Sequence, residues 1–281
     1  MRIDKAARRP ELDLRTAGPS DSERLSELQA PDTDGLPDIV ALVADKAATL
    51  ETEILPGYLQ RRRWFASKDR PISSCRITKI CRLPGEDPQM ALYKVETAHG
   101  STTDSWLLPL AVVWESQVQP LSKALALARI RCGGADALLT DAFSHAEFAC
   151  RLVQEMRSHS TIAASGGEVL CTWIPADSQS RAGAEPHSVD WLSAEQSNSS
   201  LVVDGSVMLK IFRRVASGPH PEAEMSRYLT AGGFANTPAL LGEVVGRDRA
   251  GQTQTLAVAQ AFVGNQGDAW NWALPQFARY L

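Results

Sequence analysis

The sequence predicts an α+β protein made of two units, each with antiparallel strands and a few helices. Three observations lead to this prediction. Runs with strand character are separated by short turn signals, and helical periodicity is confined to a few segments. A loop-like stretch at 175–190, rich in Pro, Ser, Gly and Ala, divides the chain. The length of 281 residues also suits two domains better than one.

Composition excludes several kinds of protein. Hydrophobic residues make up 44% and charged residues 22%, and the net charge of −4 argues against nucleic acid as the main partner. No apolar run approaches the roughly 18 residues of a membrane span, and the N-terminus has no secretory h-region, so we expect a cytoplasmic protein without membrane contacts. The five cysteines lack CxxC spacing and the five histidines are scattered, so we expect reduced thiols and no zinc site.

The first unit is predicted to span 37–174, after a disordered tail or linker at 1–36. A helix of about 17 residues begins near Ile39 and ends before Pro56. A second helix is predicted from Ser144 to His159, with Ser144 and Glu147 as a capping box. The predicted strands are 72–83, 90–98, 104–115 and a hairpin flanking Cys132-Gly133-Gly134. The sequence does not decide to which of the two units the run 169–174 belongs.

A basic and aromatic stretch, Arg61 to Phe65, has two interpretations. Arginines beside aromatic rings are typical of nucleic-acid contact and base stacking. Alternatively, Trp64 and Phe65 enter the core while the arginines stay in water. The acidic net charge favours the second interpretation.

The second unit, 191–263, carries a lysine inside an apolar run. Asp204-Gly205 between two apolar segments predicts a hairpin with a two-residue turn. This turn would pair Val203 with Ser206 and place Lys210 opposite Ser199, beside the polar segment 195–200. An ammonium on an apolar face needs a negative partner, and a turn rich in hydroxyl, amide and N–H groups is suited to phosphate.

A candidate partner lies on the next predicted helix. Pro221 suits its first turn, which also contains Glu222 and Glu224. Glu224 borders the expected apolar side of the helix, formed by Met225, Tyr228 and Leu229. A strand lysine paired with a helix glutamate beneath a phosphate-covering turn is the arrangement of a protein-kinase N-lobe. Alternatively, the lysine side chain reaches water and the glutamate stabilises the helix N-terminus. The sequence has no GxGxxG motif that would favour the kinase arrangement over this alternative.

The end of the chain continues this pattern. Segments 240–245 and 253–263 are predicted to pair as strands, and Gly264 to Asp268 forms a hinge-like break. The last segment, 269–281, is helix-like. We expect it to expose an apolar patch that drives self-association, consisting of Trp270, Trp272, Phe277 and Tyr280.

Several stretches, in this order, resemble the maltokinase family, especially the form fused behind trehalose synthase. They are ILPGYLQRRRWFASKDRPI, LLTDAFSHAEF, LSAEQSNSS, SVMLKIFRR, PEAEMSRYL, FANTPALLG and VAQAFVGNQGDAW. The resemblance implies an N-terminal cap domain at 37–174, a linker at 175–190, a kinase-like N-lobe at 191–263, and a hinge with the start of a C-lobe at 264–281. It also implies transfer of the γ-phosphoryl group of ATP to the anomeric hydroxyl of maltose, with Mg²⁺.

The resemblance assigns roles by position. Lys210 would hold the α/β-phosphates of ATP, and Glu224 would orient Lys210. The turn that covers the phosphates would contain Gln196, Ser197, Asn198, Ser199 and Ser200. The approach to the adenine-side hinge would contain Gln260, Phe262 and Val263.

One part of the family pattern is absent from this sequence. The HGD-like and DFEG-like motifs, which carry the catalytic and metal-binding aspartates in the family's C-lobe, do not occur. We therefore expect no catalytic residue and no metal ligand in this chain, a missing C-lobe, and weak ATP binding. Maltose would bind only with a C-lobe, and the partner would be a trehalose synthase domain or a separate C-lobe chain. The alternative is a catalytically dead binding or scaffold module.

Overall fold

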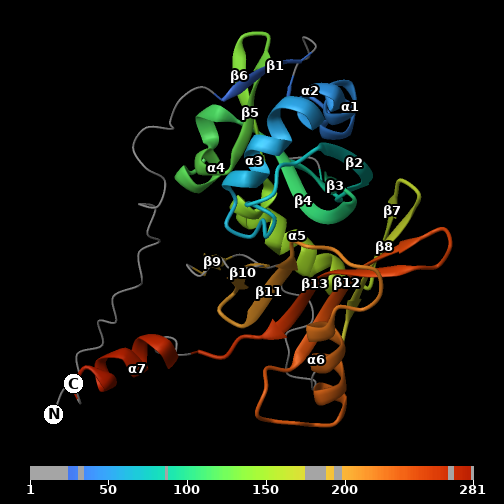
Figure 1. Cartoon of the computed structure of the whole chain (residues 1–281). Coiled ribbons are helices and arrows are strands. Elements are labelled where there is room, and N and C mark those ends of the chain that lie inside the picture. The colour runs from blue at the N-terminus through green and yellow to red at the C-terminus, as the bar shows by residue number, and fades with distance from the viewer. Residues whose placement is uncertain are drawn as a thin grey trace.

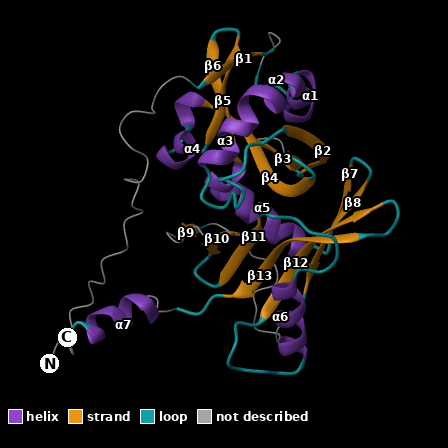
Figure 2. Ribbon diagram, in the orientation of Figure 1, coloured by secondary structure: helices purple, strands orange, loops and turns teal. Residues whose placement is uncertain are grey.

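The structure, a computed structural model, describes residues 25–30, 35–85, 88–174, 188–192, 198–264 and 269–279. It contains two sheets, the first in the upper and the second in the lower part of Figure 1. Helices lie against both sheets (Figure 2). The predicted α+β class, with two mostly antiparallel sheets, is confirmed.

The first sheet has six strands in the order β1-β5-β6-β4-β3-β2. All of its pairings are antiparallel except β1 with β5. The three predicted strands and the predicted hairpin are confirmed. The bounds are β1 Ser26–Gln29, β2 Ser74–Arg82, β3 Gln89–His99, β4 Thr102–Trp114, β5 Ala126–Cys132 and β6 Ala135–Asp141.

Strand β4 explains why the stretch from Leu107 to Val113 is continuously apolar rather than alternating. Its side chains point alternately into two different cores, one on each face of the first sheet. One core receives Leu107, Ala111 and Val113. The other receives Trp106, Leu108, Leu110 and Val112.

The N-terminal helical segment is longer than predicted. It begins with α1 (Ile39–Asp45), continues through α2 (Ala47–Thr49) and a π-helical turn (Leu50–Ile54), and ends with α3 (Leu55–Arg61). Pro56 does not stop it, because this proline lies in the first turn of α3, where its missing N–H costs little. The side chain of Asp38 caps α1 by accepting hydrogen bonds from the N–H groups of Val40 and Ala41.

Strand β1 corrects the prediction that residues 1–36 lack regular structure. Ser26–Gln29 pair in parallel with β5, and Leu28 is buried in the core under α1 to α3. The strand has four residues and only one of them is buried, so no periodicity marks it in the sequence.

In the basic and aromatic stretch, the interpretation that the two aromatic rings enter the core is confirmed. Trp64 and Phe65 are buried against Trp106, with ring centroids 6.0 and 4.7 Å from it. Arg61 and Arg63 are exposed. The five cysteines are all buried and free, as expected for small apolar core residues.

The second sheet has seven strands in the order β7-β8-β12-β13-β11-β10-β9. The predicted pairing of 240–245 with 253–263 is confirmed. The bounds are β7 Thr161–Ala164, β8 Gly167–Trp173, β9 Val189–Trp191, β10 Asn198–Val203, β11 Val207–Phe212, β12 Leu240–Asp248 and β13 Thr253–Ala261. Since β8 pairs with β12, residues 161–173, which we placed in the first unit, contribute strands to the second sheet.

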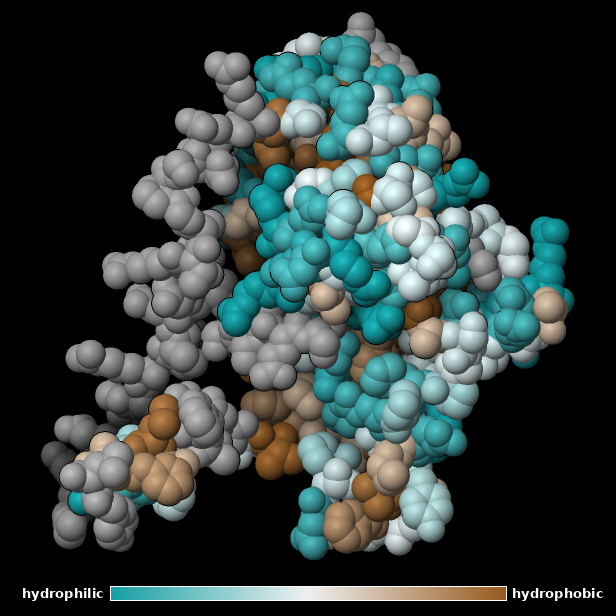
Figure 3. Space-filling model, in the orientation of Figure 1, coloured by the Kyte–Doolittle hydropathy of each residue, from teal (hydrophilic) through white to brown (hydrophobic). Residues whose placement is uncertain are grey.

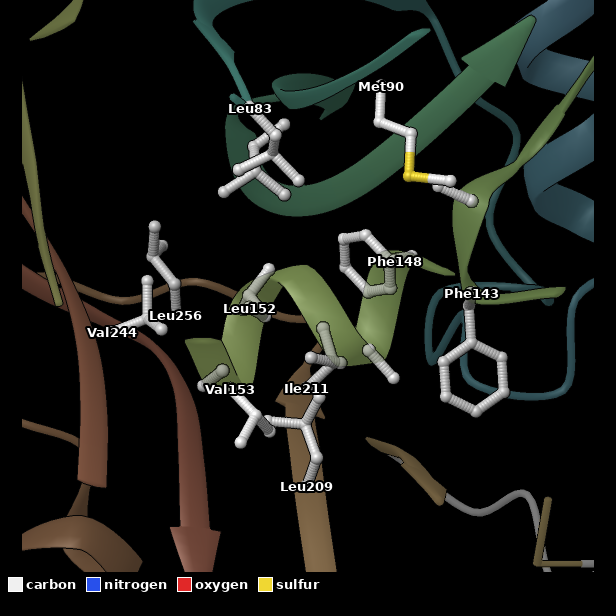
Figure 4. Close-up of a cluster of buried hydrophobic side chains, with 14 of the residues drawn as sticks. Leu83, Met90, Phe143, Phe148, Leu152, Val153, Leu209, Ile211, Val244 and Leu256 are labelled. Carbon is white, nitrogen blue, oxygen red and sulfur yellow. The ribbon is translucent and has the colours of Figure 1, made fainter. Parts of the chain in front are cut away.

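Helix α5 (Ala146–Arg157) lies between the two sheets and fills a core that both share. In Figure 4, Phe148 points toward Met90 of the first sheet, and Val153 lies beside Leu209 and Ile211 of β11. The predicted capping box is wrong: the N-cap is His145, and Ser144 instead donates its hydroxyl to the carbonyl of Asp141.

Candidate functional site

Lys210 lies near the middle of β11, but not opposite the residue that we expected. Val203 pairs with Val207 rather than Ser206, so three residues form the turn and every pair is shifted by one. Ser200 therefore faces Lys210, and Ser199 faces Ile211. On its other side Lys210 pairs with Val258 of β13, so Ser200, Lys210 and Val258 form one row on one face of the second sheet.

The ammonium of Lys210 forms an ion pair with Glu222, and not with Glu224 as expected. Its Nζ is 2.7 Å from both carboxylate oxygens of Glu222, and the two side chains are 23% and 32% exposed. Because the side chain of Lys210 is partly exposed, an anionic ligand can reach its ammonium from solvent. The pair joins a lysine on a strand to a glutamate on a helix, the combination that the sequence predicted with a different glutamate.

The helix α6 (Pro221–Ala231) faces the sheet with a different side than the sequence suggested. Its buried residues are Ala223 and Ser226, whereas Met225 and Tyr228 are 58% and 76% exposed. Because successive helical residues are separated by about 100°, Glu222 borders the buried side and Glu224 points away. The assumption that Tyr228 marks the buried face led to the wrong glutamate.

The N-terminus of α6 is fixed by His220. Its Nδ1 accepts a hydrogen bond from the N–H of Glu222 at 3.3 Å, and its ring stacks on Phe212 at 3.8 Å between centroids. Burial lowers the pKa of His220, and the charge of Lys210 lowers it further, against the opposing effect of Glu222. The lowered pKa favours the neutral imidazole, which can accept this hydrogen bond.

Two further contacts hold α6 against the sheet. Arg227 binds both carboxylate oxygens of the largely buried Glu243 of β12, with a shortest distance of 2.7 Å. Gln260 donates to the hydroxyl of Ser226 at 3.0 Å, and both side chains are buried. Gln260 was expected on the way to the adenine-side hinge, but its side chain points to α6.

The predicted phosphate-covering turn is described only in part. Gln196 and Ser197 lie outside the described residues. Asn198 and Ser200 are half-buried and share the face of Lys210, as their pairing with Phe212 and Lys210 requires. Ser199 is fully buried on the opposite face, where its hydroxyl accepts a hydrogen bond from Arg213 Nε at 2.8 Å, so it cannot face a phosphate on the Lys210 side.

Phe262 and Val263, predicted to lead into the hinge, directly follow β13, and of the predicted hinge, 264–268, only Gly264 is among the described residues. The N–H of Phe262 donates to the carbonyl of Ser206 at 2.7 Å, so the chain leaves the sheet beside the β10–β11 turn. Phe262 is half-buried and Val263 is 59% exposed. Beyond them lies helix α7 (Ala269–Phe277), whose Trp272 and Phe277 are 70% and 65% exposed. Figure 3 shows hydrophobic residues at the surface over both α6 and α7.

Sequence reasoning missed Arg213 and Asp141. These two residues form an ion pair, with Arg213 Nη1 2.9 Å from Asp141 Oδ2, and neither side chain is exposed. Nothing local in the sequence marks this pair, because Asp141 ends a strand of the first sheet and Arg213 follows a strand of the second.

An apolar cavity of about 50 Å³ lies between the sheets, away from Lys210. Its walls come from both sheets and include Leu92, Leu107, Val169 and Leu256. The part of the chain that the structure describes contains no group of three or more His, Cys, Asp or Glu residues suited to a metal ion. Within the same residues, no helix is long and apolar enough to cross a membrane.

Comparison with known families finds a match within the first unit. Residues 58–144, from α3 to the short turn after β6, match the maltokinase N-terminal cap domain. The match bears out the resemblance for this part of the chain, and the name "cap domain" is used below for residues 58–144.

Two solved structures are similar to a larger part of the chain. They are crystal forms A and B of a glucosamine kinase, with 17% and 18% sequence identity and TM-scores of 0.44 and 0.45. Each similarity covers 78% of this chain but only 44% and 43% of the glucosamine kinase chain. The matched region therefore amounts to less than half of the length of these kinases.

Proposed function

We propose that this chain supplies the cap domain and the ATP-binding part of a maltokinase-type kinase. One observation carries the proposal: a partly exposed strand lysine, Lys210, is neutralised by a helix glutamate, Glu222, in a chain whose residues 58–144 match a maltokinase cap domain. The reaction would be transfer of the γ-phosphoryl group of ATP to maltose, giving maltose 1-phosphate.

In this proposal Lys210 binds the α/β-phosphates of ATP, and Glu222 keeps its ammonium directed along the sheet face. Glu222 replaces Glu224 in the role that the family resemblance suggested. Asn198 and Ser200 share the face of Lys210, so they are placed to approach the same phosphates. The segment around Phe262 and Val263 would pass the adenine.

Phosphoryl transfer also needs a group that orients the sugar hydroxyl and carboxylates that hold Mg²⁺. The described residues contain no group of three or more His, Cys, Asp or Glu side chains that could hold a metal ion. We propose that these groups come from a C-lobe, in the same protein or in a partner chain, and that Mg²⁺ and maltose bind only in its presence. A trehalose synthase domain is the proposed further partner.

The first test is ATP binding by the full chain, measured by isothermal titration. A hydrogen bond to a charged group contributes about 1.5–3 kcal/mol, so Lys210→Met is expected to weaken ATP binding by about 10-fold or more. The matched control is Lys123→Met, which removes an exposed lysine of the helix α4 (Pro120–Ala124). Equal affinity in Lys210→Met and the parent chain would contradict the proposal.

A second pair of variants tests which glutamate acts. Glu222→Gln is expected to weaken ATP binding, because the ammonium of Lys210 loses its charged partner. Glu224→Gln changes an exposed side chain of the same helix and is expected to have no effect. The opposite result would mean that Glu224 takes over when nucleotide binds.

Catalysis is tested by phosphoryl transfer from ATP to maltose with Mg²⁺, with and without an added C-lobe fragment. Activity that appears only with the fragment supports the proposal. Activity of the chain alone would mean that its own residues complete the site. No activity in either case, together with no ATP binding, would favour the alternative function of a catalytically dead binding or scaffold module.

A further inference from the structure

A buried arginine links the cap domain to the strands that form the proposed ATP site. Arg213 directly follows Phe212, the last residue of β11, and its side chain is completely buried. Its Nη1 is 2.9 Å from Asp141 Oδ2 in the cap domain, and its Nε donates to Ser199 Oγ in β10 at 2.8 Å. One guanidinium thus contacts both parts of the chain.

The cap domain surrounds this guanidinium with fixed groups. The rings of Trp64 and Phe143 lie 4.9 and 5.4 Å from its central carbon. Asp141 is itself oriented, because it accepts hydrogen bonds from the N–H of Phe143 at 3.0 Å and from the hydroxyl of Tyr58 at 3.3 Å. Burial raises the pKa of Tyr58, which keeps its hydroxyl protonated as a donor.

The chain around Arg213 is attached to the cap domain at several points. The carbonyl of Arg213 accepts from the N–H of Leu107 at 2.7 Å, and the N–H of Val215 donates to the carbonyl of Ser105 at 2.8 Å. The neighbouring Arg214 binds Asp104 at 2.6 Å. The C-terminal end of β11, two residues beyond Lys210, is therefore held by strand β4.

Ser199 is the residue of β10 that Arg213 connects to Asp141 of the cap domain. It lies directly before Ser200, the residue that pairs with Lys210, and near the start of β10. Its hydroxyl faces away from Lys210 and toward Arg213, so it cannot bind a nucleotide on the Lys210 side but can fix the strand that carries Asn198 and Ser200. A buried charged hydrogen bond of this kind sets the position of a strand more strictly than apolar packing alone.

We propose that Arg213 is a positioning residue through which the cap domain holds the start of β10 against Lys210, and so raises affinity for the phosphates of ATP. The proposal rests on the function proposed above and gives the cap domain a defined part in it. It requires that the link affects binding of the phosphates and leaves binding of the nucleoside unchanged.

The test compares ATP with adenosine in the full chain. Ser199→Ala removes the hydroxyl that Arg213 binds and leaves the Arg213–Asp141 pair in place. We expect about 2- to 10-fold weaker binding of ATP, the range for one hydrogen bond, with unchanged binding of adenosine. The matched control is Thr140→Ala, which removes another fully buried hydroxyl of the cap domain, bonded to the carbonyl of Ser122 at 2.8 Å. This control should leave both affinities unchanged.

A merely structural role of Ser199 would give a different result. It would lower the unfolding temperature of Ser199→Ala as in Thr140→Ala, with ATP and adenosine affinities changed equally or not at all. That result would overturn the inference while leaving the proposed function intact. If the parent chain itself failed to bind ATP, the proposed function would fail first and the inference with it.

A second measurement needs no nucleotide. Asp141→Asn weakens the hold on Arg213, so amide hydrogen exchange of 198–203 is expected to become at least several-fold faster. The strand β13, 253–261, pairs with β12 and β11 and not with β10, so it serves as the internal reference. Faster exchange confined to the cap domain would also overturn the inference.

Discussion

Removing the carboxylate of Asp141 should be among the most damaging single changes to stability in this chain. Asp141→Ala leaves the guanidinium of Arg213 without a counter-charge at a site where neither side chain is exposed. Loss of one partner of a buried ion pair costs about 3–5 kcal/mol. The donors on Tyr58 and Phe143 lose their acceptor as well, so we expect a value near the upper end of this range.

A double-mutant cycle separates the pair from other effects. Arg213→Met should cost less, near 3 kcal/mol, because Asp141 keeps the Tyr58 and Phe143 donors. In the double variant no buried charge remains, so its loss should be smaller than the sum of the two single losses by about 1–3 kcal/mol.

The assay is urea unfolding followed by circular dichroism and by tryptophan fluorescence, since Trp64 stacks on Arg213. Asp136→Ala is the control, because its pair with Arg131 is 33% and 43% exposed and should contribute less than about 1 kcal/mol. A loss for Asp141→Ala as small as for this control, or strictly additive single losses, would refute the reasoning.

Three further predictions concern stability and thiol chemistry. Asp38→Ala removes the cap of α1 and should cost about 1 kcal/mol at pH 7. The hydrogen bond from Ala41 lowers the pKa of Asp38, so this stabilisation is complete at neutral pH and is lost as the pH falls below about 4, where the difference between variant and parent should vanish in unfolding curves. Leu152→Ala, in the core shared by both sheets, should cost about 2–5 kcal/mol in the same assay. Burial raises the pKa of Cys81 to about 12, and all five thiols are buried, so a disulfide reagent should react with them at pH 8 only after unfolding; fast reaction of the native chain would contradict this.

Local signals in the sequence were sufficient to predict most elements. Strands bounded by Gly and Pro turns, such as β3 and β4, follow from β-propensity and turn chemistry over a few residues. The helix α6 follows from Pro221 at its first turn. These features depend on neighbouring residues, which a single sequence displays.

The sequence predicted the strand lysine and a helix glutamate of the candidate site. It did not predict the register of the hairpin or which glutamate pairs with Lys210. The hairpin at Asp204-Gly205 exists, and both residues have the positive φ that such a turn needs, but Ser206 joins the turn, so the register is shifted by one residue. Glu222 replaced Glu224 because α6 meets the sheet through the small residues Ala223 and Ser226. Which side of a helix is buried depends here on how closely two backbones approach, and hydrophobicity alone does not report it.

Pairings between distant parts of the chain could not be predicted. Strand β1 joins the first sheet through β5, and β8 joins the second sheet through β12. The Arg213–Asp141 pair likewise joins two segments whose own sequences give no sign of each other. In each case the partner is chosen by the packing of whole sheets, and no local pattern carries this information.

The position of β8 has a consequence for synthesis on the ribosome. Leu170 of β8 pairs with Val245 of β12, which is translated only after β9, β10, β11 and α6. At about 5–20 residues per second, this interval lasts several seconds. Until β11 has been made, the apolar side of α5 that packs on this strand, including Val153, lacks this partner. The nascent chain therefore exposes an apolar helix face beside a completed first sheet. Chaperones bind surfaces of this kind.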